Sequence, residues 1–340
     1  MKQLKFNNSL EDKDLYEYSN HINDFDHIES ILLYDGTTET SKPLISITIP
    51  CYRKELLKQA VDSALNQDFG DSYEIVIIDN DSDDKTNRFL DYVRGLKSDK
   101  IRYYKNKKNI GIFGNWNRCI QLARADYMVF LHADDQLVHS TLSSLWKIHL
   151  KINSESAIIG RYCELDESNN IVKEYRKKNG IIKSKEFYRI SPYGLFLGDS
   201  CNGCGSLLSV SAMKKLGGFN PALYPMSDRV LFLQYADKYG LYRMNNIVRK
   251  ETTMISTSAG CYDQFAACDY LLSKAVITKY YSFFIAKLLQ WVNIHKYYVF
   301  LTASFDWDKS NISKKKPSVL SRLVTRVARG CYWFVDKKII

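Results

Sequence analysis

The stretch Y-M-V-F-L-H-A-D-D, residues 127–135, is the strongest indication of the fold class of this chain. Its apolar part predicts a buried strand, and the adjacent carboxylates of Asp134 and Asp135 end that strand. Open α/β sheets bind ligands just beyond the carboxyl ends of their strands, and two oxygen ligands there suit Mg²⁺ or Mn²⁺. The plain alternative is that Asp134 only caps a helix that starts near Ser140.

Strand and helix patterns alternate around this stretch. We predict four strands, at 45–49, 73–78, 101–104 and 127–131, each followed by a helix, at 55–67, 85–96, 113–123 and 140–152. Such alternation is typical of a parallel, doubly wound sheet, and near-continuous apolar strands indicate that helices cover both faces. The predicted fold class is therefore α/β, with a mostly parallel sheet flanked by helices.

The pattern changes after residue 154. The remaining segments are predicted to be strands at 157–163 and 171–175, a loop and strand within and after 194–206, a helix at 228–239, an extended segment at 241–253 and a helical region at 269–300. Residues 1–43 are acidic, with a short helix expected around 10–33. We therefore expect an N-terminal extension at 1–43, an α/β domain at 44–265 with halves at 44–153 and 154–265, and a helical, basic C-terminal region at 266–340.

The composition is that of an ordinary globular chain. Of the 340 residues, 45% are hydrophobic and 25% are charged, and the net charge is +10. The eight cysteines include one CxxC pair, Cys201 and Cys204, with no second pair and no suitably spaced histidine, which disfavours zinc and thioredoxin-like chemistry. No apolar signal segment and no apolar run of about 18 residues are present, so we expect a cytoplasmic chain with reduced cysteines.

Polar side chains gather where the predicted strands end. The first strand runs into P-C-Y-R, the second into D-N-D-S, and a loop at 109–117 opens the third helix. Because the carboxyl ends of parallel strands meet at one edge, these segments predict a cleft for a nucleotide and a cation. Asp79 would accept a hydrogen bond from a base or ribose, Tyr52 would flank the base, and Gly111 would let the backbone approach closely. Taken singly, each also has an ordinary structural explanation as a cap, a turn or a packing residue.

A dinucleotide-binding dehydrogenase is the obvious competitor. It needs G-x-G-x-x-G directly after the first strand. Here P-C-Y-R follows that strand, and the only glycine pair in a helix-opening loop, Gly111 and Gly114, comes after the third strand. The sequence therefore disfavours this class.

Residues 44–150 resemble the nucleotide-binding half of family 2 glycosyltransferases, which have the GT-A fold. The resemblance is carried by S-I-T-I-P-C-Y-R-K-E-L-L-K-Q-A-V-D-S-A-L-N-Q (46–67), E-I-V-I-I-D-N-D-S-D-D-K-T (74–86), N-I-G-I-F-G-N-W-N-R-C-I (109–120) and F-L-H-A-D-D (130–135). The order and spacing of four motifs make it specific, and the G-N-W-N-R loop is similar to that of members that act on bacterial surface polysaccharides.

The resemblance implies a nucleotide-diphosphate sugar donor, with a UDP-sugar expected, bound together with Mn²⁺ or Mg²⁺. The metal ligands would be Asp134 and Asp135, and the cation would neutralise the charge that grows on the departing nucleotide diphosphate. The implied nucleotide-sugar site comprises Pro50, Tyr52, Arg53, Glu55, Asp79, Asn109, Gly111, Asn117, His132, Ala133 and Asp134.

This chain departs from the family pattern at the first acidic position of that motif. His132 stands where the family usually has Asp, which leaves open which of Asp134 and Asp135 is the main metal ligand. Arg53 and Trp116 also replace commoner polar residues. Donor selectivity is therefore expected to differ from that of other members.

The second half supplies the base that the resemblance implies. In the family a Glu-Asp pair follows a G-G-F segment, and its Asp deprotonates the acceptor hydroxyl; here Gly217-Gly218-Phe219 leads to Ser227, in place of the Glu, and to Asp228. An inverting transfer needs one such carboxylate opposite the leaving group. The alternative is that Asp228 only caps a helix. The sugar and acceptor pocket of the family corresponds to Gly203, Gly205 and Ser206.

The C-terminal region has a basic amphipathic pattern. Three lysines at 314–316 precede a segment in which Arg322, Arg326 and Arg329 alternate with apolar residues, namely Val319, Leu320, Leu323, Val324 and Val327. Such a helix suits anionic lipid headgroups, so we expect a protein that is peripheral at the inner face of the cell membrane. The alternative is a helix that packs back on the domain. No nucleic-acid-binding motif is recognised.

The resulting hypothesis is an inverting, metal-dependent, hexosyltransferase-type glycosyltransferase. It would transfer a sugar to a saccharide or lipid-linked saccharide in the synthesis of O-antigen, capsule or lipopolysaccharide. One rival is a sugar nucleotidyltransferase, which would need a Gly-rich, basic loop after the first strand, where P-C-Y-R-K-E is a poor version. The other is a non-catalytic subunit that binds nucleotide sugar in a polysaccharide assembly complex, suggested by His132 and Ser227.

Overall fold

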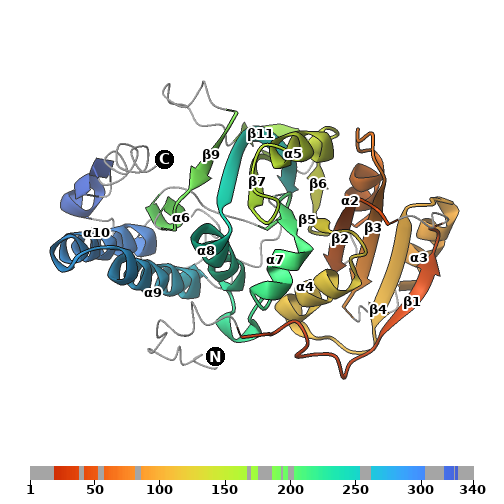
Figure 1. Cartoon of the computed structure of the whole chain (residues 1–340), viewed down its shortest axis with the longest axis horizontal. Coiled ribbons are helices and arrows are strands. Elements are labelled where there is room, and N and C mark those ends of the chain that lie inside the picture. Colours follow the sequence, from red (N-terminus) through yellow and green to blue (C-terminus); the bar gives the residue numbers. More distant parts are fainter. Residues whose placement is uncertain are drawn as a thin grey trace. The chain divides into compact units, whose positions relative to one another are not determined.

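The computed structural model describes most of the chain, in two compact units. The described residues are 19–37, 42–52, 57–80, 86–166, 170–174, 186–192, 194–197, 203–252, 262–302, 318–324 and 326–327. The first unit, drawn from residues 19–189 and 201–255, contains the sheet (Figure 1). The second unit, drawn from residues 190–200 and 256–340, contains α6 (Gly194–Leu197), α9 (Tyr262–Tyr280) and α10 (Phe283–Thr302).

One mixed sheet organises the first unit. Its strands follow the order β1 (Ser30–Asp35), β4 (Ile101–Asn106), β3 (Tyr73–Asp79), β2 (Ile45–Cys51), β5 (Tyr127–Phe130), β10 (Leu207–Ser209), β7 (Ala157–Leu165), β11 (Leu241–Thr252) and β6 (Asp135–Leu137). Off this path, β8 (Ile171–Glu174) pairs with β7, and β9 (Phe187–Ile190) pairs with β11.

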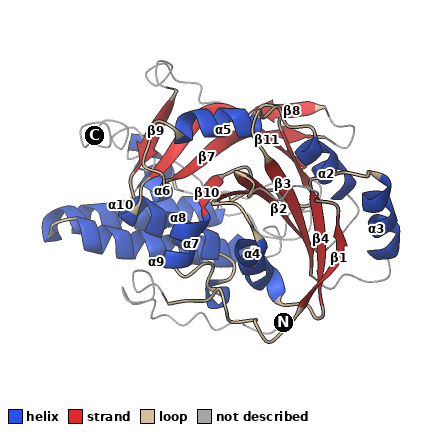
Figure 2. Cartoon of the chain, turned by 45° about the vertical axis from the view of Figure 1, so that its right-hand side comes forward, coloured by secondary structure: helices blue, strands red, loops and turns tan. Residues whose placement is uncertain are grey.

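Helices cover both faces of this sheet. In Figure 2, one face carries α2 (Leu57–Leu65), α3 (Thr86–Gly95) and α5 (Thr141–His149). The other carries α4 (Gly111–Leu122), α7 (Val210–Lys215) and α8 (Ser227–Lys238), with the short 3₁₀ helix η1 (Pro221–Leu223) before α8. Within the part of the chain that the structure describes, no helix combines the length and the apolar character needed to cross a membrane.

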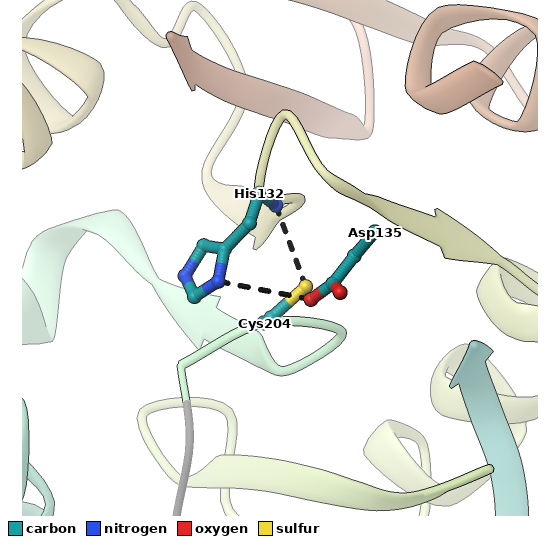
Figure 3. A group of neighbouring side chains, drawn as sticks. All are labelled: His132, Asp135 and Cys204. Carbon is teal, nitrogen blue, oxygen red and sulfur yellow. Dashed lines mark hydrogen bonds and ion pairs between the residues drawn. The ribbon is translucent and has the colours of Figure 1, made fainter. Parts of the chain in front are cut away.

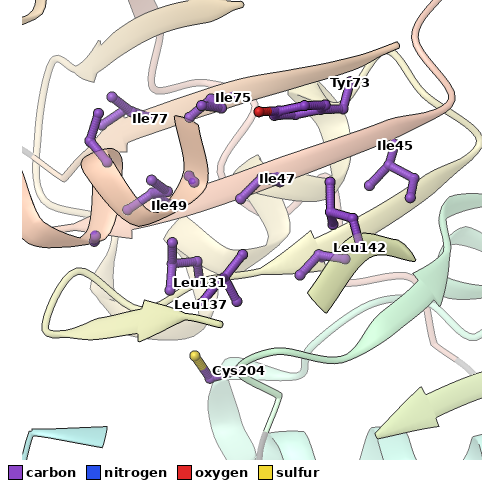
Figure 4. Close-up of a cluster of buried hydrophobic side chains, with 14 of the residues drawn as sticks. Ile45, Ile47, Ile49, Tyr73, Ile75, Ile77, Leu131, Leu137, Leu142 and Cys204 are labelled. Atoms are coloured by element: carbon purple, nitrogen blue, oxygen red, sulfur yellow. The ribbon is translucent and has the colours of Figure 1, made fainter. Parts of the chain in front are cut away.

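The central strands are apolar because both of their faces are buried. Successive side chains of a strand point to opposite faces, so Ile45, Ile47 and Ile49 of β2 pack under α2, α3 and α5, as Figure 4 shows for part of this cluster. Val76 and Ile78 of β3 are buried as well, although they lie outside that cluster. The near-continuous apolar runs of the sequence therefore arise because helices cover both faces of these strands, as predicted.

The predicted parallel sheet is confirmed in the first half. Strand β2 pairs in parallel with β3 and β5, and β3 pairs in parallel with β4. The second half is mixed, because β10 runs antiparallel to both β5 and β7, and β11 is parallel to β7 but antiparallel to β6. The sheet as a whole is therefore less parallel than predicted.

Three local predictions need correction. Residues 30–33, expected within a helix, belong to β1, which pairs antiparallel with β4 at the edge of the sheet. The helical region expected at 269–300 is two helices, α9 and α10, interrupted at Tyr281 and Ser282. The predicted loop at 194–206 begins with the short helix α6, and residues 198–202 lie outside the described part.

Candidate active site

The turn between β5 and β6 presents two adjacent carboxylates in different environments. The backbone N–H of Asp135 donates to the carbonyl of His132 at 3.1 Å, which closes a four-residue turn with Ala133 and Asp134 at its tip. Asp134 is exposed, whereas Asp135 is only 3% exposed. Although the two residues are neighbours in the sequence, only Asp134 is open to a ligand.

Asp135 is held by a buried arginine from a distant strand. Arg249 Nη1 donates to Asp135 Oδ2 at 2.9 Å, and Arg249 Nη2 lies 3.1 Å from Glu251 Oε2. The guanidinium also lies over the Tyr162 ring, 4.5 Å from its centroid. Since Glu251 faces Asp135 in the antiparallel pairing of β11 with β6, the ion pair fastens the turn to the second half of the sheet. No local pattern in the sequence indicates this partner of Asp135.

His132 occupies the base of the same turn (Figure 3). Its ring stacks on Trp116 at 5.2 Å between centroids, and its Nδ1 lies 3.7 Å from Asp135 Oδ2. Its backbone N–H donates to the Sγ of Cys204 at 3.4 Å. Among the described residues, the buried Nε2 of His132 has no hydrogen-bond partner. A polar group left unpaired at a strand end is a candidate contact for a ligand.

Two sets of side chains at this turn could bind a metal: the group of His132, Asp135 and Cys204, and the exposed Asp134. His132, Asp135 and Cys204 offer ligand atoms within 4.8 Å of one another, but they fit a metal poorly. Burial, and then the charge of Asp135, raise the pKa of the Cys204 thiol well above its ordinary value, which disfavours the thiolate that binds metals. Asp135 is already paired with Arg249.

Asp134 fits a hard cation better. The surrounding protein atoms, and then the neighbouring Asp135 carboxylate, raise the pKa of Asp134 although its side chain stays open to solvent. A divalent cation beside this carboxylate would stabilise the charged form. Mg²⁺ and Mn²⁺ use exposed carboxylate oxygens as ligands and complete their coordination with phosphate and water oxygens.

The residues predicted to contact the nucleotide differ in accessibility. Tyr52, at the end of β2, is 54% exposed, and Pro50 is partly buried within that strand. Gly111 is exposed with a φ of +74°, a conformation that glycine adopts without strain, and its N–H donates to Asn109 Oδ1 at 2.8 Å. Asp79 is fully buried and accepts a hydrogen bond from the hydroxyl of Tyr103 at 2.9 Å. A ligand would therefore reach Asp79 only after the groups that cover it moved. Arg53 and Glu55 lie outside the described residues.

Asn80 holds the loop that carries Asn109 and Gly111. Its side-chain amide donates to Asn109 Oδ1 and to the carbonyl of Gly111, both at 3.1 Å, and its oxygen accepts from the N–H of Ile110 at 3.0 Å. The sequence interpretation did not assign Asn80 this role. Its place directly after Asp79, in D-N-D-S, was the available signal.

Asn117 faces the protein interior. It is 1% exposed, and its amide donates to the carbonyls of Phe219 at 2.7 Å and His21 at 3.0 Å, while its oxygen accepts from the N–H of Phe219 at 2.8 Å. Both donor hydrogens of the amide are therefore used. The predicted nucleotide contact of Asn117 has no support in this arrangement, which instead fastens the G-G-F segment to α4.

Asp228 lies in the first turn of α8. Met226 occupies the N-cap position, so Asp228 is not the cap that the alternative explanation required, and its Oδ1 accepts from the N–H of Arg229 at 2.8 Å. Burial raises the pKa of Asp228 to about 6. The neighbouring hydroxyl of Ser227 is buried and has no hydrogen-bond partner among the described residues.

An aromatic cluster connects the segment before Asp228 with the turn that carries Asp134. Phe219 contacts Trp116 at 5.1 Å between ring centroids, and Trp116 in turn stacks on His132. The approach requires glycine at position 218, since its φ is +72° and an added Cβ would lie 2.6 Å from Asn117 Oδ1. The structure thus brings together two segments that are almost 90 residues apart in the printed sequence.

The residues predicted for the sugar and acceptor pocket lie beside the end of β5. The N–H of Gly205 donates to the carbonyl of Phe130 at 2.7 Å, and Gly205 has a φ of +70°. The nearest atom to an added Cβ at Gly203 belongs to the Trp116 ring, at 4.0 Å. Ser206 is fully buried. These residues adjoin the aromatic cluster, and all three are buried.

Comparisons with known proteins agree on the family. The model of "Glycosyl transferase family 2" matches residues 46–217. A GalNAc(5)-diNAcBac-PP-undecaprenol beta-1,3-glucosyltransferase of Campylobacter jejuni is 26% identical over 230 residues, covering 65% of this chain and 70% of the relative. An abequosyltransferase of Salmonella typhimurium is 38% identical over 104 residues, covering 30% of this chain and 31% of the relative.

Solved structures share the fold. Staphylococcus aureus TarS 1–349 in complex with UDP-GlcNAc has a TM-score of 0.55 and 13% sequence identity, and the match covers 84% of this chain and 79% of that chain. The predicted GT-A-like architecture, an α/β sheet flanked by helices, is confirmed by this likeness.

Proposed function

The chain belongs to glycosyl transferase family 2, and we propose that it is an inverting, metal-dependent transferase of bacterial surface-polysaccharide synthesis. It would move a sugar from a nucleotide-diphosphate donor to a saccharide or lipid-linked saccharide. The observation that carries this proposal is the exposed Asp134 carboxylate at the tip of the turn after β5, beside the buried pair of Asp135 and Arg249.

The proposed donor is a UDP-sugar. Support comes from the structural relative, whose complex contains UDP-GlcNAc. Exposed Tyr52 would stack on the base, and Gly111 with Asn109 would approach the nucleotide through the loop that Asn80 holds. Pro50, Asp79, His132 and Ala133 would line the site, together with Arg53 and Glu55, which lie outside the described residues.

Asp134 is the proposed ligand of Mn²⁺ or Mg²⁺. When bound, the cation would neutralise the charge that grows on the departing nucleotide diphosphate. Asp135 was predicted as a second ligand, but its pairing with Arg249 favours a different role, in which it fixes the orientation of the turn. Metal-site ligands commonly depend on such supporting contacts.

Asp228 is the proposed base. It would accept the proton of the acceptor hydroxyl while that oxygen forms a bond to C1 of the sugar and the bond from C1 to the diphosphate breaks. A carboxyl group whose pKa is about 6 is deprotonated near neutral pH, yet binds a proton more tightly than an ordinary aspartate. Gly203, Gly205 and Ser206 would border the sugar and acceptor.

A lipid-linked acceptor is supported by the name of the Campylobacter relative, whose substrate is an undecaprenol diphosphate saccharide. The basic C-terminal segment also supports work at a membrane surface. In the described part of that segment, Val319, Leu320 and Leu323 are more than half exposed, and Arg322 and Arg326 are exposed as well.

Asp228→Asn and Asp134→Asn test this proposal. Asp228→Asn should lower the turnover number of sugar transfer by roughly 10²–10⁴-fold while donor binding is kept, because only the proton acceptor is lost. Asp134→Asn should weaken Mn²⁺-dependent donor binding, measured as the thermal shift given by UDP-sugars with and without Mn²⁺. The exposed carboxylate of Asp126 provides a matched control, Asp126→Asn, with activity unchanged.

The outcomes separate the rival functions. Wild-type turnover in both active-site variants would rule out the assigned mechanism. Nucleotide-sugar binding without transfer to any acceptor would identify a binding subunit. Release of pyrophosphate from a nucleoside triphosphate and a sugar phosphate would identify a nucleotidyltransferase.

A further inference from the structure

The outward face of α10 is unusually apolar for an exposed helix. Among the residues of this helix whose side chains the structure describes, 283–295, six large apolar side chains are exposed, and Phe284 at 83%, Phe283 at 66% and Leu288 at 61% are the most exposed of them. The others are Ile285, Trp291 and Ile294. A contiguous patch of exposed apolar side chains commonly marks a site of interaction with a protein or a membrane.

This face is not the one that α10 uses to pack on its neighbour. The buried positions of the helix include Ala286 and Asn293, and Asn293 Nδ2 donates to the carbonyl of Tyr270 in α9 at 3.1 Å. Helices α9 and α10 are joined through Tyr281 and Ser282 and lie side by side (Figures 1 and 2). An ordinary surface helix buries its apolar stripe and exposes its polar one. Helix α10 has its packing face satisfied and still exposes aromatic side chains.

Positive charge accompanies the apolar face. The sequence of α10 contains Lys287 and Lys296 and no Asp or Glu. Lys287 Nζ lies 4.5 Å from the centroid of the Phe283 ring, so the cation sits at the edge of the apolar side chains. His295 Nδ1 is 3.0 Å from Ser321 Oγ, which joins α10 to the segment that carries Arg322 and Arg326.

We propose that α10 is a membrane-docking helix that lies in the interface of an anionic lipid surface. Phe284, Leu288 and Trp291 would enter the boundary between headgroups and acyl chains, and Lys287 would contact lipid phosphates. The helix lies on the membrane and does not cross it. This docking rests on the proposed transfer to a lipid-linked acceptor, because it holds the enzyme at the surface where such an acceptor is found.

Charge complementarity favours lipid over a second copy of the chain. Two copies of α10 facing each other would bring lysines together without any acidic side chain of the same helix to pair with them. An anionic bilayer supplies the missing negative charge and also accepts the aromatic rings. An anionic bilayer would therefore attract Lys287, whereas a second copy of α10 would repel it.

Vesicle binding by the full chain tests the proposal. The wild type should float with vesicles of phosphatidylcholine and phosphatidylglycerol and much less with phosphatidylcholine alone. Phe284→Ser combined with Leu288→Ser should lower the partition coefficient by at least about tenfold, because two apolar side chains no longer gain from burial. Leu150→Ser, at a 71% exposed leucine in the first unit, is the matched control and should bind like the wild type.

Each outcome has a meaning. The proposal is overturned if the wild type does not bind anionic vesicles, or if the double variant binds as well as the wild type. It is also overturned if sedimentation shows a wild-type dimer that the double variant converts to monomer while neither binds vesicles. Donor hydrolysis in solution should be equal in the wild type and the double variant, so loss of vesicle binding is distinguishable from failure of the proposed chemistry.

Discussion

Two buried arginine–carboxylate pairs lie in the first unit, and they differ in what surrounds them. Arg102 pairs with Glu74 at 2.7 Å near the amino end of β3, and both side chains are at most 4% exposed. Arg249 pairs with Asp135 at 2.9 Å, just after the carboxyl end of β5, and both are 4% exposed. The chemistry and burial are alike, so any functional difference must come from the neighbours.

The pair at the amino end is closed. Arg102 also donates to the carbonyl of Leu122 and to the hydroxyl of Tyr104, and Glu74 accepts from Ser46 Oγ and from the N–H of Arg124. Each charged group thus has several partners, as buried ions require. This network can only support the fold.

The pair at the carboxyl end has two open groups beside it. Asp134 is exposed beside it, and the Nε2 of His132 has no partner among the described residues. The same interaction therefore stabilises the fold at one end of the sheet and, at the other end, holds the turn that carries the proposed metal ligand Asp134. Burial of an ion pair therefore does not by itself indicate function, and the candidate site is distinguished by the open groups beside its pair.

Removing the arginines gives the largest expected effect and tests the comparison directly. Arg102→Met and Arg249→Met should each lower the free energy of unfolding by about 3–5 kcal/mol, because each leaves a carboxylate buried without its partner. Urea denaturation measures both losses. Only Arg249→Met should also raise the Mn²⁺ concentration needed for half-maximal transfer, since only that variant releases the turn that carries Asp134.

Arg249→Lys, which keeps the positive charge, provides a milder variant if the methionine variant does not fold. Equal metal dependence in the Arg102 and Arg249 variants, measured where both are folded, would mean that the two pairs are alike in function as well as in chemistry.

Gly218→Ala should have an intermediate effect. The residue needs a left-handed backbone, and its new Cβ would press on Asn117 and so disturb the segment that leads to Asp228. We expect a loss of about 1–3 kcal/mol in the free energy of unfolding, together with reduced transfer. Gly95→Ala is the control, because an added Cβ there meets no atom within 4 Å, and its thermal midpoint should not fall. A Gly218→Ala protein as stable and active as the wild type would show that the close packing of Gly218 against Asn117 is not required.

The pH dependence of transfer gives the smallest expected effect. Burial raises the pKa of Asp228 to about 6, and the base acts only when deprotonated, so kcat/KM should be constant above that pH and fall as the pH drops through about 6. At one pH unit below the pKa the loss is about tenfold. Profiles at saturating Mn²⁺ measure it, with Arg102→Lys, at the amino-end pair, expected to keep the same profile. A profile without an acidic limb near that value would argue against Asp228 as the base.

Local sequence accounts for much of the first half of the sheet. Strands β2, β3, β4 and β5 and their helices were predicted within a few residues, because each element carries its own apolar period and its own boundary signals. The strand-end positions of Tyr52, Gly111 and Asp134 follow from the same reasoning, since parallel strands place their carboxyl ends at one edge.

The features that local sequence patterns did not reveal depend on contacts between distant segments. Residues 30–33 were predicted to belong to a helix, but they lie in β1, which pairs with β4 at the edge of the sheet. Only the folded chain provides that edge. Asn117 lies in a motif that resembles a nucleotide loop, and local sequence did not indicate that its amide also holds Phe219, more than 100 residues away.

By itself, then, the sequence determined the α/β class, the family and the set of polar residues at the strand ends, because these depend on local patterns and on short-range order. The folded structure was needed to show which of two adjacent aspartates is open and which is bound to Arg249, 114 residues away. It also decided that α10 exposes its aromatic face. Both depend on long-range contacts, and a helical or strand period states which side chains share a face but not what lies opposite that face.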